Sequence, residues 1–168
     1  NVDNVANAIT AETKMVFVET IANPRTQIAD LKAIGELCQQ RGLIYVVDNT
    51  MTSPYLFQPR SVGASLVVNS LTKYISGHGN VLGGVVTELG TYDWGAFQNI
   101  YADYRKGDSV RWGITQIRKK GLRDLGAALA AQAAHDISKG AETLALRMER
   151  QCSNAQVLAE FLQQQPSC

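Results

Sequence analysis

The sequence predicts an α/β domain whose mostly parallel sheet is flanked by helices. Short runs rich in valine and isoleucine are separated by a helix or by a connection of crossover length, which is typical of parallel strand pairing. Each run is apolar along its length, as expected of strands covered on both faces. The chain has 168 residues, the size of one domain, and its hydrophobic content of 45% is enough for a buried core.

Three apolar runs are the predicted parallel strands. They are Met15–Val18, Leu43–Val47 and the residues around Leu66–Val68. Between the first two, residues 28–41 predict an amphipathic helix, and Gly42 follows where a C-terminal cap is expected. The apolar residues at helical spacing are Ile28, Leu31, Ile34, Leu37 and Cys38.

The second half of the chain has one further predicted strand and is otherwise predicted to be loop and helix. Val85–Thr87 predicts a fourth strand of undetermined direction, and residues 92–111, rich in aromatic and charged side chains, predict a loop with short helical pieces. From Ile114 the pattern is helical, including an alanine-rich stretch at 127–134 for which close helix packing is expected. We expect residues 142–165 to form a last helix that extends away from the sheet. Its predicted apolar face is Leu144, Met148, Cys152, Ala155, Leu158, Ala159 and Leu162.

Charge and cysteine content exclude several classes of protein. The formal net charge is +1, and no apolar run has membrane length, so neither nucleic acid nor a membrane is expected as a partner. Cys38, Cys152 and Cys168 are far apart and odd in number, and show neither a disulfide framework nor a metal-ligand spacing. We therefore expect a cytoplasmic protein without a metal site, in which Cys38 is inert. The N-terminus does not resemble a signal peptide, and the chain is expected to begin partway through a longer protein.

Polar side chains follow each of the three predicted parallel strands. They lie at residues 19–23, 48–50 and 69–73. In open α/β sheets, ligands bind beyond the carboxyl ends of the strands. The three segments therefore predict one ligand site.

These segments contain the groups that a pyridoxal 5'-phosphate (PLP) site needs, namely an amine, an anion for the ring nitrogen, phosphate donors and a partner for the ring hydroxyl. Lys73, just past a buried strand, is the candidate amine, and Asp48 is the candidate partner of the pyridinium. Ser70 and Thr72 are two residues apart, so in extended geometry their hydroxyls would face one phosphate while Lys73 points the other way. Asn23 is the right type to donate to the ring oxygen.

The order of the motifs resembles the Cys/Met-metabolism family of PLP enzymes, which includes cystathionine γ-synthase, cystathionine γ-lyase, methionine γ-lyase and the O-acyl-homoserine sulfhydrylases. The resemblance covers most of the chain, and only the region around residues 92–111 departs from it. The motifs are Glu19–Pro24, Val47–Thr50, Ser53–Tyr55, Ser70–Tyr74, Gly77-His78, Gly83-Gly84, Gly121–Asp124 and Glu142–Arg150.

The resemblance implies a fold similar to aspartate aminotransferase (fold type I). Residues 1–140 would be the later half of the PLP-binding large domain, and 141–168 a helix leading to a missing small domain. It implies that Lys73 binds the cofactor, Asp48 pairs with the pyridinium, Ser70 and Thr72 hold the phosphate, and Asn23 contacts the ring hydroxyl.

The implied activity is PLP-dependent β- or γ-elimination, or γ-replacement, on a cysteine, methionine or homoserine derivative. A homodimer or homotetramer is implied, because family members complete the active site with residues of the partner subunit. The family's earlier phosphate loop, its ring-stacking aromatic residue and its later carboxylate-binding arginine lie outside this chain. The chain is therefore also consistent with a truncated, non-catalytic fragment that folds and dimerises.

Each site residue also has a simpler interpretation. Asp48 alone would suit a turn or a helix N-cap, and Ser70 and Thr72 would suit strand-end hydrogen bonds. His78, between glycines, suits a structural role better than a catalytic one. Ser70 and Lys73 also satisfy the Ser-x-x-Lys pattern of acylating hydrolases, but neither companion motif of those enzymes is present.

Overall fold

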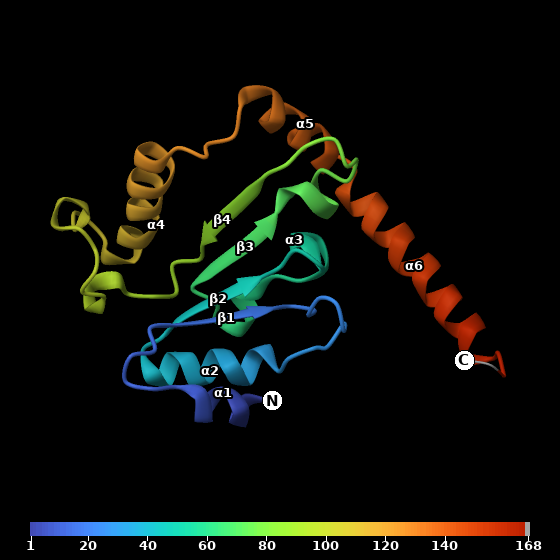
Figure 1. Ribbon diagram of the computed structural model, residues 1–168, viewed down its shortest axis with the longest axis horizontal. Coiled ribbons are helices and arrows are strands. Elements are labelled where there is room, and N and C mark those ends of the chain that lie inside the picture. The colour runs from blue at the N-terminus through green and yellow to red at the C-terminus, as the bar shows by residue number, and fades with distance from the viewer. Residues whose placement is uncertain (167–168) are drawn as a thin grey trace.

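The computed structural model describes residues 1–166 and contains one four-stranded sheet in the order β1-β2-β3-β4. The strands are β1 (Met15–Glu19), β2 (Ile44–Asp48), β3 (Leu66–Ser70) and β4 (Gly84–Glu88). The first three are parallel, and β4 runs antiparallel to β3 (Figure 1). The prediction of a mostly parallel α/β sheet is confirmed, and the direction of the fourth strand is now determined.

The central strand β2 explains why its run is apolar throughout. Tyr45 and Val47 pack on one face with Ile34 and Cys38, whereas Ile44 and its alternate neighbour Val46 pack on the opposite face with aromatic residues. Successive side chains of a strand point to opposite faces, so a strand covered on both sides must be apolar at every position.

Helices α1 (Val2–Ala8) and α2 (Leu31–Arg41) cover the first of these faces. The α2 helix begins three residues later than the apolar pattern, because the Asp30 carboxylate accepts a hydrogen bond from the Ala33 amide at 3.0 Å and caps the helix there. Ile28 is left exposed. Gly42 ends the helix in the left-handed conformation, with φ of 65°, as predicted.

The segment predicted as a loop with short helical pieces covers the other face of the sheet. It contains short 3₁₀ turns at Trp94–Ala96, Ala102–Tyr104 and Ser109–Arg111. Trp94 is buried against the sheet, and its indole N–H donates to the Glu88 carboxylate at 2.7 Å. Trp94 and Tyr104 of this segment are therefore core residues, whereas Tyr101 is exposed. Two short elements connect β2 to β3, α3 (Ser53–Leu56) and a 3₁₀ turn (Pro59–Val62).

The helical region after residue 112 is interrupted where the sequence predicted continuity. Helix α4 (Trp112–Gln116) continues as a wider π-type turn (Ile117–Asp124), and α5 begins only at Ala131 and runs to Ala141. Gly126 and Ala127 have positive φ angles of 84° and 61°, which no helix accommodates. The expectation of a helix through 127–134 is wrong at its first half, and the alanine stretch makes no close helix packing there.

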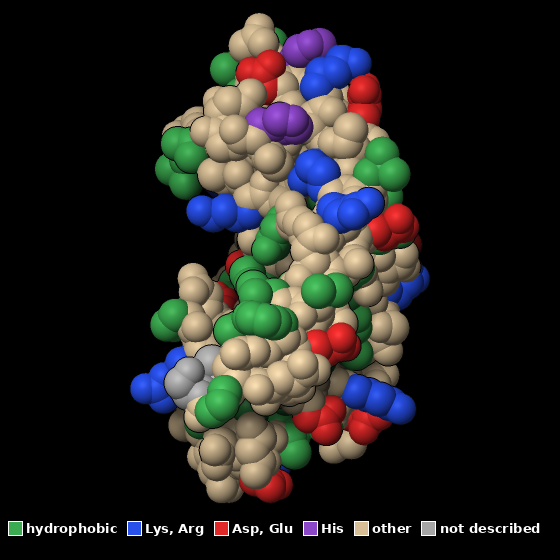
Figure 2. Space-filling view, turned by 90° about the vertical axis from the view of Figure 1, so that its right-hand side faces the viewer, with side chains coloured by type: hydrophobic (Ala, Val, Ile, Leu, Met, Phe, Trp, Pro, Cys, Tyr) green, Lys and Arg blue, Asp and Glu red, His purple; other side chains and the backbone are tan. Residues whose placement is uncertain are grey.

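Helix α6 (Leu144–Gln163) extends away from the sheet, as predicted (Figure 1). Of the seven residues predicted to form its apolar face, only Met148 is buried. Leu158, Phe161 and Leu162 are among the large hydrophobic residues that are exposed. Figure 2 views the molecule from this side, where hydrophobic side chains lie at the surface among charged ones. The predicted domain boundary at residue 140 stays a prediction, and Cys168 lies outside the described residues.

Across residues 1–166, no helix is both long enough and apolar enough to cross a bilayer.

Burial of Cys38 makes its contribution to stability depend on pH. Its thiol is 1% exposed, and loss of solvation raises the pKa from 9.0 to about 11. The unfolded chain releases this proton above pH 9.0, whereas the folded chain holds it up to about pH 11, so stability falls with rising pH in that window.

We expect the difference in unfolding free energy between the wild-type chain and Cys38→Ala to shrink as the pH rises through the same window. Urea unfolding followed by circular dichroism measures this difference. Tyr45, whose pKa is also raised by burial, is present in both chains. A difference that stays constant with pH would contradict this account.

Candidate functional site

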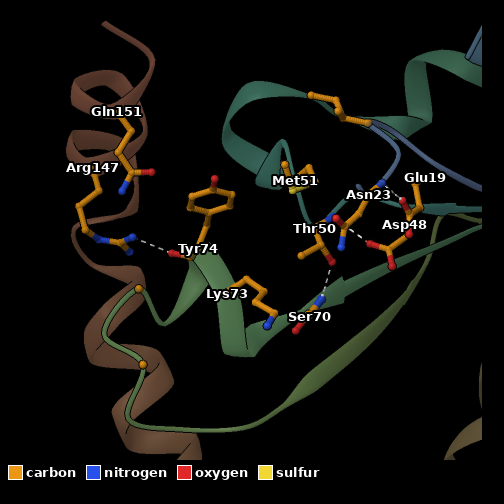
Figure 3. A pocket seen from close by; sticks show the side chains of 13 residues that line it. Glu19, Asn23, Asp48, Thr50, Met51, Ser70, Lys73, Tyr74, Arg147 and Gln151 are labelled. Carbon is orange, nitrogen blue, oxygen red and sulfur yellow. Dashed lines mark hydrogen bonds between the residues drawn. The ribbon is translucent and has the colours of Figure 1, made fainter. Parts of the chain in front are cut away.

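A cavity of about 570 Å³ opens at the carboxyl ends of the three parallel strands. The strand ends form one side, and α6 forms the other (Figure 3). Its lining residues are Glu19, Ile21, Asn23, Asp48, Thr50, Met51, Ser70, Lys73, Tyr74, Gly77, Gly79, Arg147 and Gln151. Four of the five predicted site residues, all except Thr72, therefore meet in one place.

Strand register brings the three polar segments together. Glu19 is the direct partner of Asp48 in the ladder between β1 and β2. The pairing continues past the strands, because the Asn49 amide donates to the Val68 carbonyl at 2.8 Å. The Ser70 amide donates to the Thr50 hydroxyl at 2.8 Å. The loop after β2 is thus fixed to the end of β3.

Buried Asn49 holds the loop that carries Asp48. Its side-chain amide donates to the carbonyls of Ser53 at 3.0 Å and Phe57 at 2.9 Å, and its oxygen accepts from the Thr52 hydroxyl at 2.6 Å. A buried amide with these partners fixes the backbone on both sides of it. Asn49 belongs to a motif noted in the sequence, but its structural role needs partners four and eight residues away that periodicity does not reveal.

The two carboxylate oxygens of Asp48 have different surroundings. Its Oδ1 accepts the Thr50 amide at 2.9 Å, which is the turn interaction that the sequence left open. Its Oδ2 makes no hydrogen bond within residues 1–166, and the side chain lines the cavity. One oxygen orients the carboxylate, and the other is available to a ligand.

Asn23 occupies the rim on the side of β1. The Glu19 carboxylate accepts the Asn23 amide at 2.7 Å and so shapes the loop after β1 (Figure 3). The side-chain amide of Asn23 is exposed and lines the cavity without a protein partner among the described residues. Glu19 is thus a second acidic residue at the cavity, and the sequence analysis assigned it no role.

The chain does not continue in extended geometry beyond Ser70, as the sequence analysis assumed. Strand β3 ends at Ser70, and a π-type helical turn, Leu71–Ile75, follows with a kink at Lys73. Ser70 and Lys73 consequently face the same cavity. The Thr72 hydroxyl instead accepts the Gly83 amide at 3.0 Å and lies 3.3 Å from the Gly83 carbonyl oxygen.

Lys73 is exposed within the open cavity, and its side chain makes no ion pair or hydrogen bond in the part of the chain that the structure describes. The Lys73 amine is therefore open to solvent, although the strand that precedes it is largely buried. His78 bonds the Ser76 carbonyl through Nδ1 and does not line the cavity, which supports its structural interpretation.

Helix α6 reaches the opposite side of the cavity through two contacts that the sequence did not predict. The Tyr55 hydroxyl of α3 donates to the Glu149 carboxylate, and this hydrogen bond raises the pKa of Tyr55 above its ordinary value. Arg147 bonds the backbone of the turn that carries Lys73. Arg147 lies in the last motif noted in the sequence, but the direction of its side chain depends on tertiary packing.

The polar groups that line the cavity are of the chemical types that PLP needs. The Lys73 amine, the Asp48 Oδ2, the Ser70 hydroxyl and the Asn23 side-chain amide have no protein hydrogen-bond partner within residues 1–166. A cation, an anion, a hydroxyl and an amide with no competing partner match the aldehyde, ring nitrogen, phosphate and ring oxygen of that cofactor. The mostly parallel sheet flanked by helices, with this cavity at its strand ends, has the fold of the fold type I PLP enzymes.

The chain belongs to the Cys/Met metabolism PLP-dependent enzyme family, whose model matches residues 1–168. It is 36% identical to O-acetyl-L-homoserine sulfhydrylase of Leptospira meyeri, over 98% of this chain and 41% of the relative. It is 39% identical to L-methionine gamma-lyase of Pseudomonas putida, over 95% of this chain and 35% of the relative.

A crystal structure from Campylobacter jejuni, of a protein assigned as an O-acetylhomoserine (thiol)-lyase, superimposes with a TM-score of 0.84. The sequences are 34% identical, and the match covers 99% of this chain and 44% of that one. That structure holds N'-pyridoxyl-lysine-5'-monophosphate. The chain spans less than half the length of these relatives.

Proposed function

We propose that this chain forms the lysine side of a PLP site that catalyses β- or γ-elimination, or γ-replacement, on a cysteine, methionine or homoserine derivative. The observation that carries the proposal is the meeting of Lys73, Asp48 and Ser70 in one cavity with unpartnered polar ends. Similarity to an O-acetyl-L-homoserine sulfhydrylase and to an L-methionine γ-lyase supports the substrate class.

Each residue has a stated role in this proposal. Lys73 would hold the cofactor through its Nζ and, once the substrate amine has taken its place there, would accept the proton from the substrate α-carbon. The Asp48 carboxylate keeps the pyridine nitrogen protonated, and PLP, when bound, supplies the electron sink for the α-carbon. The Ser70 hydroxyl donates to the phosphate, and the Asn23 amide donates to the ring oxygen.

Thr72 is a phosphate ligand in this proposal only on one condition. Its hydroxyl contacts the backbone of Gly83 on both sides, as donor and as acceptor. The Thr72 hydroxyl can donate to a phosphate only if it gives up its 3.3 Å hydrogen bond to the Gly83 carbonyl oxygen. We therefore rank Ser70 before Thr72 as a phosphate ligand.

A second candidate is a truncated, non-catalytic fragment that folds and dimerises without turnover. The observation that favours it is that the chain spans less than half of its relatives, so residues from the rest of the protein or from a second subunit of a homodimer or homotetramer would be needed for catalysis. Binding and turnover must therefore be measured separately.

The test mixes the chain with PLP, records the visible spectrum, and then assays 2-oxo acid release from L-methionine, for elimination, and homocysteine formation from O-acetyl-L-homoserine with sulfide, for replacement. A visible band with either product supports the catalytic proposal. A band without product supports the non-catalytic alternative. Absence of the band rejects the catalytic proposal, because that proposal requires the cofactor at Lys73.

A further inference from the structure

The helical turn that carries Lys73 cannot satisfy its own C-terminal carbonyls. The Leu71 carbonyl accepts the Ser76 amide at 3.1 Å, and the Lys73 carbonyl accepts the Gly77 amide at 2.8 Å. The following two carbonyls, of Tyr74 and Ile75, receive no backbone donor within the described chain. Such terminal carbonyls need a partner from elsewhere when they are shielded from water.

Arg147 of α6 supplies that partner. Its Nη1 donates to the Tyr74 carbonyl at 2.7 Å, and its Nη2 donates to the Ile75 carbonyl at 3.3 Å. The same guanidinium donates to the Gly140 carbonyl at 2.9 Å and, through Nε, to the Thr143 hydroxyl at 3.0 Å. One side chain thus joins the Lys73 turn to the end of α5 and the start of α6. Figure 3 shows the bond to Tyr74.

The backbone beyond the turn is shaped around this guanidinium. A Cβ placed on Gly77 would lie 2.3 Å from Nη1 of Arg147, and Gly77 also has a φ of +72°. Position 77 therefore needs glycine both for its conformation and for the space that the guanidinium occupies. Arg147 does not hold α6 alone, because Met148 is buried and Glu149 accepts a hydrogen bond from Tyr55.

We propose that Arg147 is a positioning residue that fixes the turn so that the Lys73 amine is presented to the cofactor. This inference rests on the proposed function of Lys73. Arginine suits the task because its planar guanidinium directs several N–H donors at once, whereas a lysine ammonium is a compact point donor on a flexible stem. A lysine at this position is therefore a partial substitute.

The experiment compares Arg147→Met and Arg147→Lys with the wild-type chain, and Arg150→Met serves as the matched control. Arg150 is exposed on the same helix, and its side chain makes no hydrogen bond within residues 1–166. Two quantities are measured, amide hydrogen exchange of residues 71–77 by mass spectrometry without cofactor, and the PLP concentration that gives half of the visible band.

For Arg147→Met we expect amide hydrogen exchange in residues 71–77 to accelerate about tenfold or more, because the turn loses the hydrogen bonds from the guanidinium to its last two carbonyls. The half-saturating PLP concentration should rise by about the same factor, since the binding-competent turn is populated less. Arg147→Lys should be intermediate in both quantities, and Arg150→Met should match the wild-type chain.

Two results would overturn the inference. One is unchanged exchange in Arg147→Met, which would mean that the guanidinium does not order the turn. The other is faster exchange with unchanged PLP binding, which would make Arg147 a purely structural residue. A wild-type chain without any visible band instead rejects the proposed function, and the exchange measurement alone still reports whether Arg147 orders the turn.

Discussion

The Lys73→Ala variant is expected to lose the visible absorption band of lysine-bound PLP completely while it keeps the fold of the wild-type chain. The loss should be complete because Lys73 is the lysine that lines the cavity with Asp48 and Ser70. Stability should change little, because the Lys73 side chain is exposed and makes no hydrogen bond or ion pair within the described chain. Visible absorbance after addition of PLP and urea unfolding measure the two effects.

Lys32→Ala is the matched control for this variant. Lys32 is an exposed lysine of α2 and does not line the cavity. A band of wild-type intensity in Lys32→Ala and none in Lys73→Ala is the expected pair of results. Equal bands in both variants would show that PLP reacts with surface lysines and would remove the basis of the proposed site.

The second large effect is expected for Gly140→Ala, at the contact between α5 and the Lys73 turn. A Cβ at position 140 would lie 1.9 Å from the Ser76 carbonyl oxygen, so the two backbones must separate. Alanine gains about 0.5–1 kcal/mol over glycine in a helix interior, but overpacking costs about 1–3 kcal/mol or more. We expect the cost of the clash to exceed the gain in helix propensity, because the atom that must move belongs to the backbone.

We therefore expect Gly140→Ala to lower the free energy of unfolding and to weaken PLP binding together. Gly121→Ala is the control, since a Cβ on Gly121 of the π-type turn meets nothing within 4 Å. That variant should be as stable as the wild-type chain, or more stable by up to about 1 kcal/mol. Urea unfolding of the three proteins decides between these expectations, and a Gly140→Ala chain as stable as the Gly121→Ala chain would contradict the close contact.

The sheet could be predicted from the sequence because its signals are local. The valine-rich runs around Val46 and Val67 are apolar at every position, which is typical of strands covered on both faces. The location of the cavity follows from the same signals, since polar residues end each parallel strand. Asp48, Ser70 and Lys73 therefore come together, as expected of strand ends at one sheet edge.

The errors arose where backbone conformation or tertiary contacts override a local pattern. Extended geometry through Thr72 was the wrong assumption, because the helical turn begins at Leu71 and redirects the side chains that follow. The alanine stretch suggested a helix, but Gly126 and Ala127 with positive φ interrupt it. The apolar residues of α6 predicted a buried face, yet the described chain provides no surface to cover Leu158 or Phe161.

The measurement that tests the central claim most directly is reduction with sodium borohydride in the presence of PLP, followed by peptide mapping. Borohydride fixes the cofactor to the lysine that holds it, so mass spectrometry identifies the residue without reference to turnover. The account predicts one pyridoxyl adduct, on the peptide that contains Lys73. An adduct spread over exposed lysines such as Lys32 and Lys139, with no preference for Lys73, would contradict it.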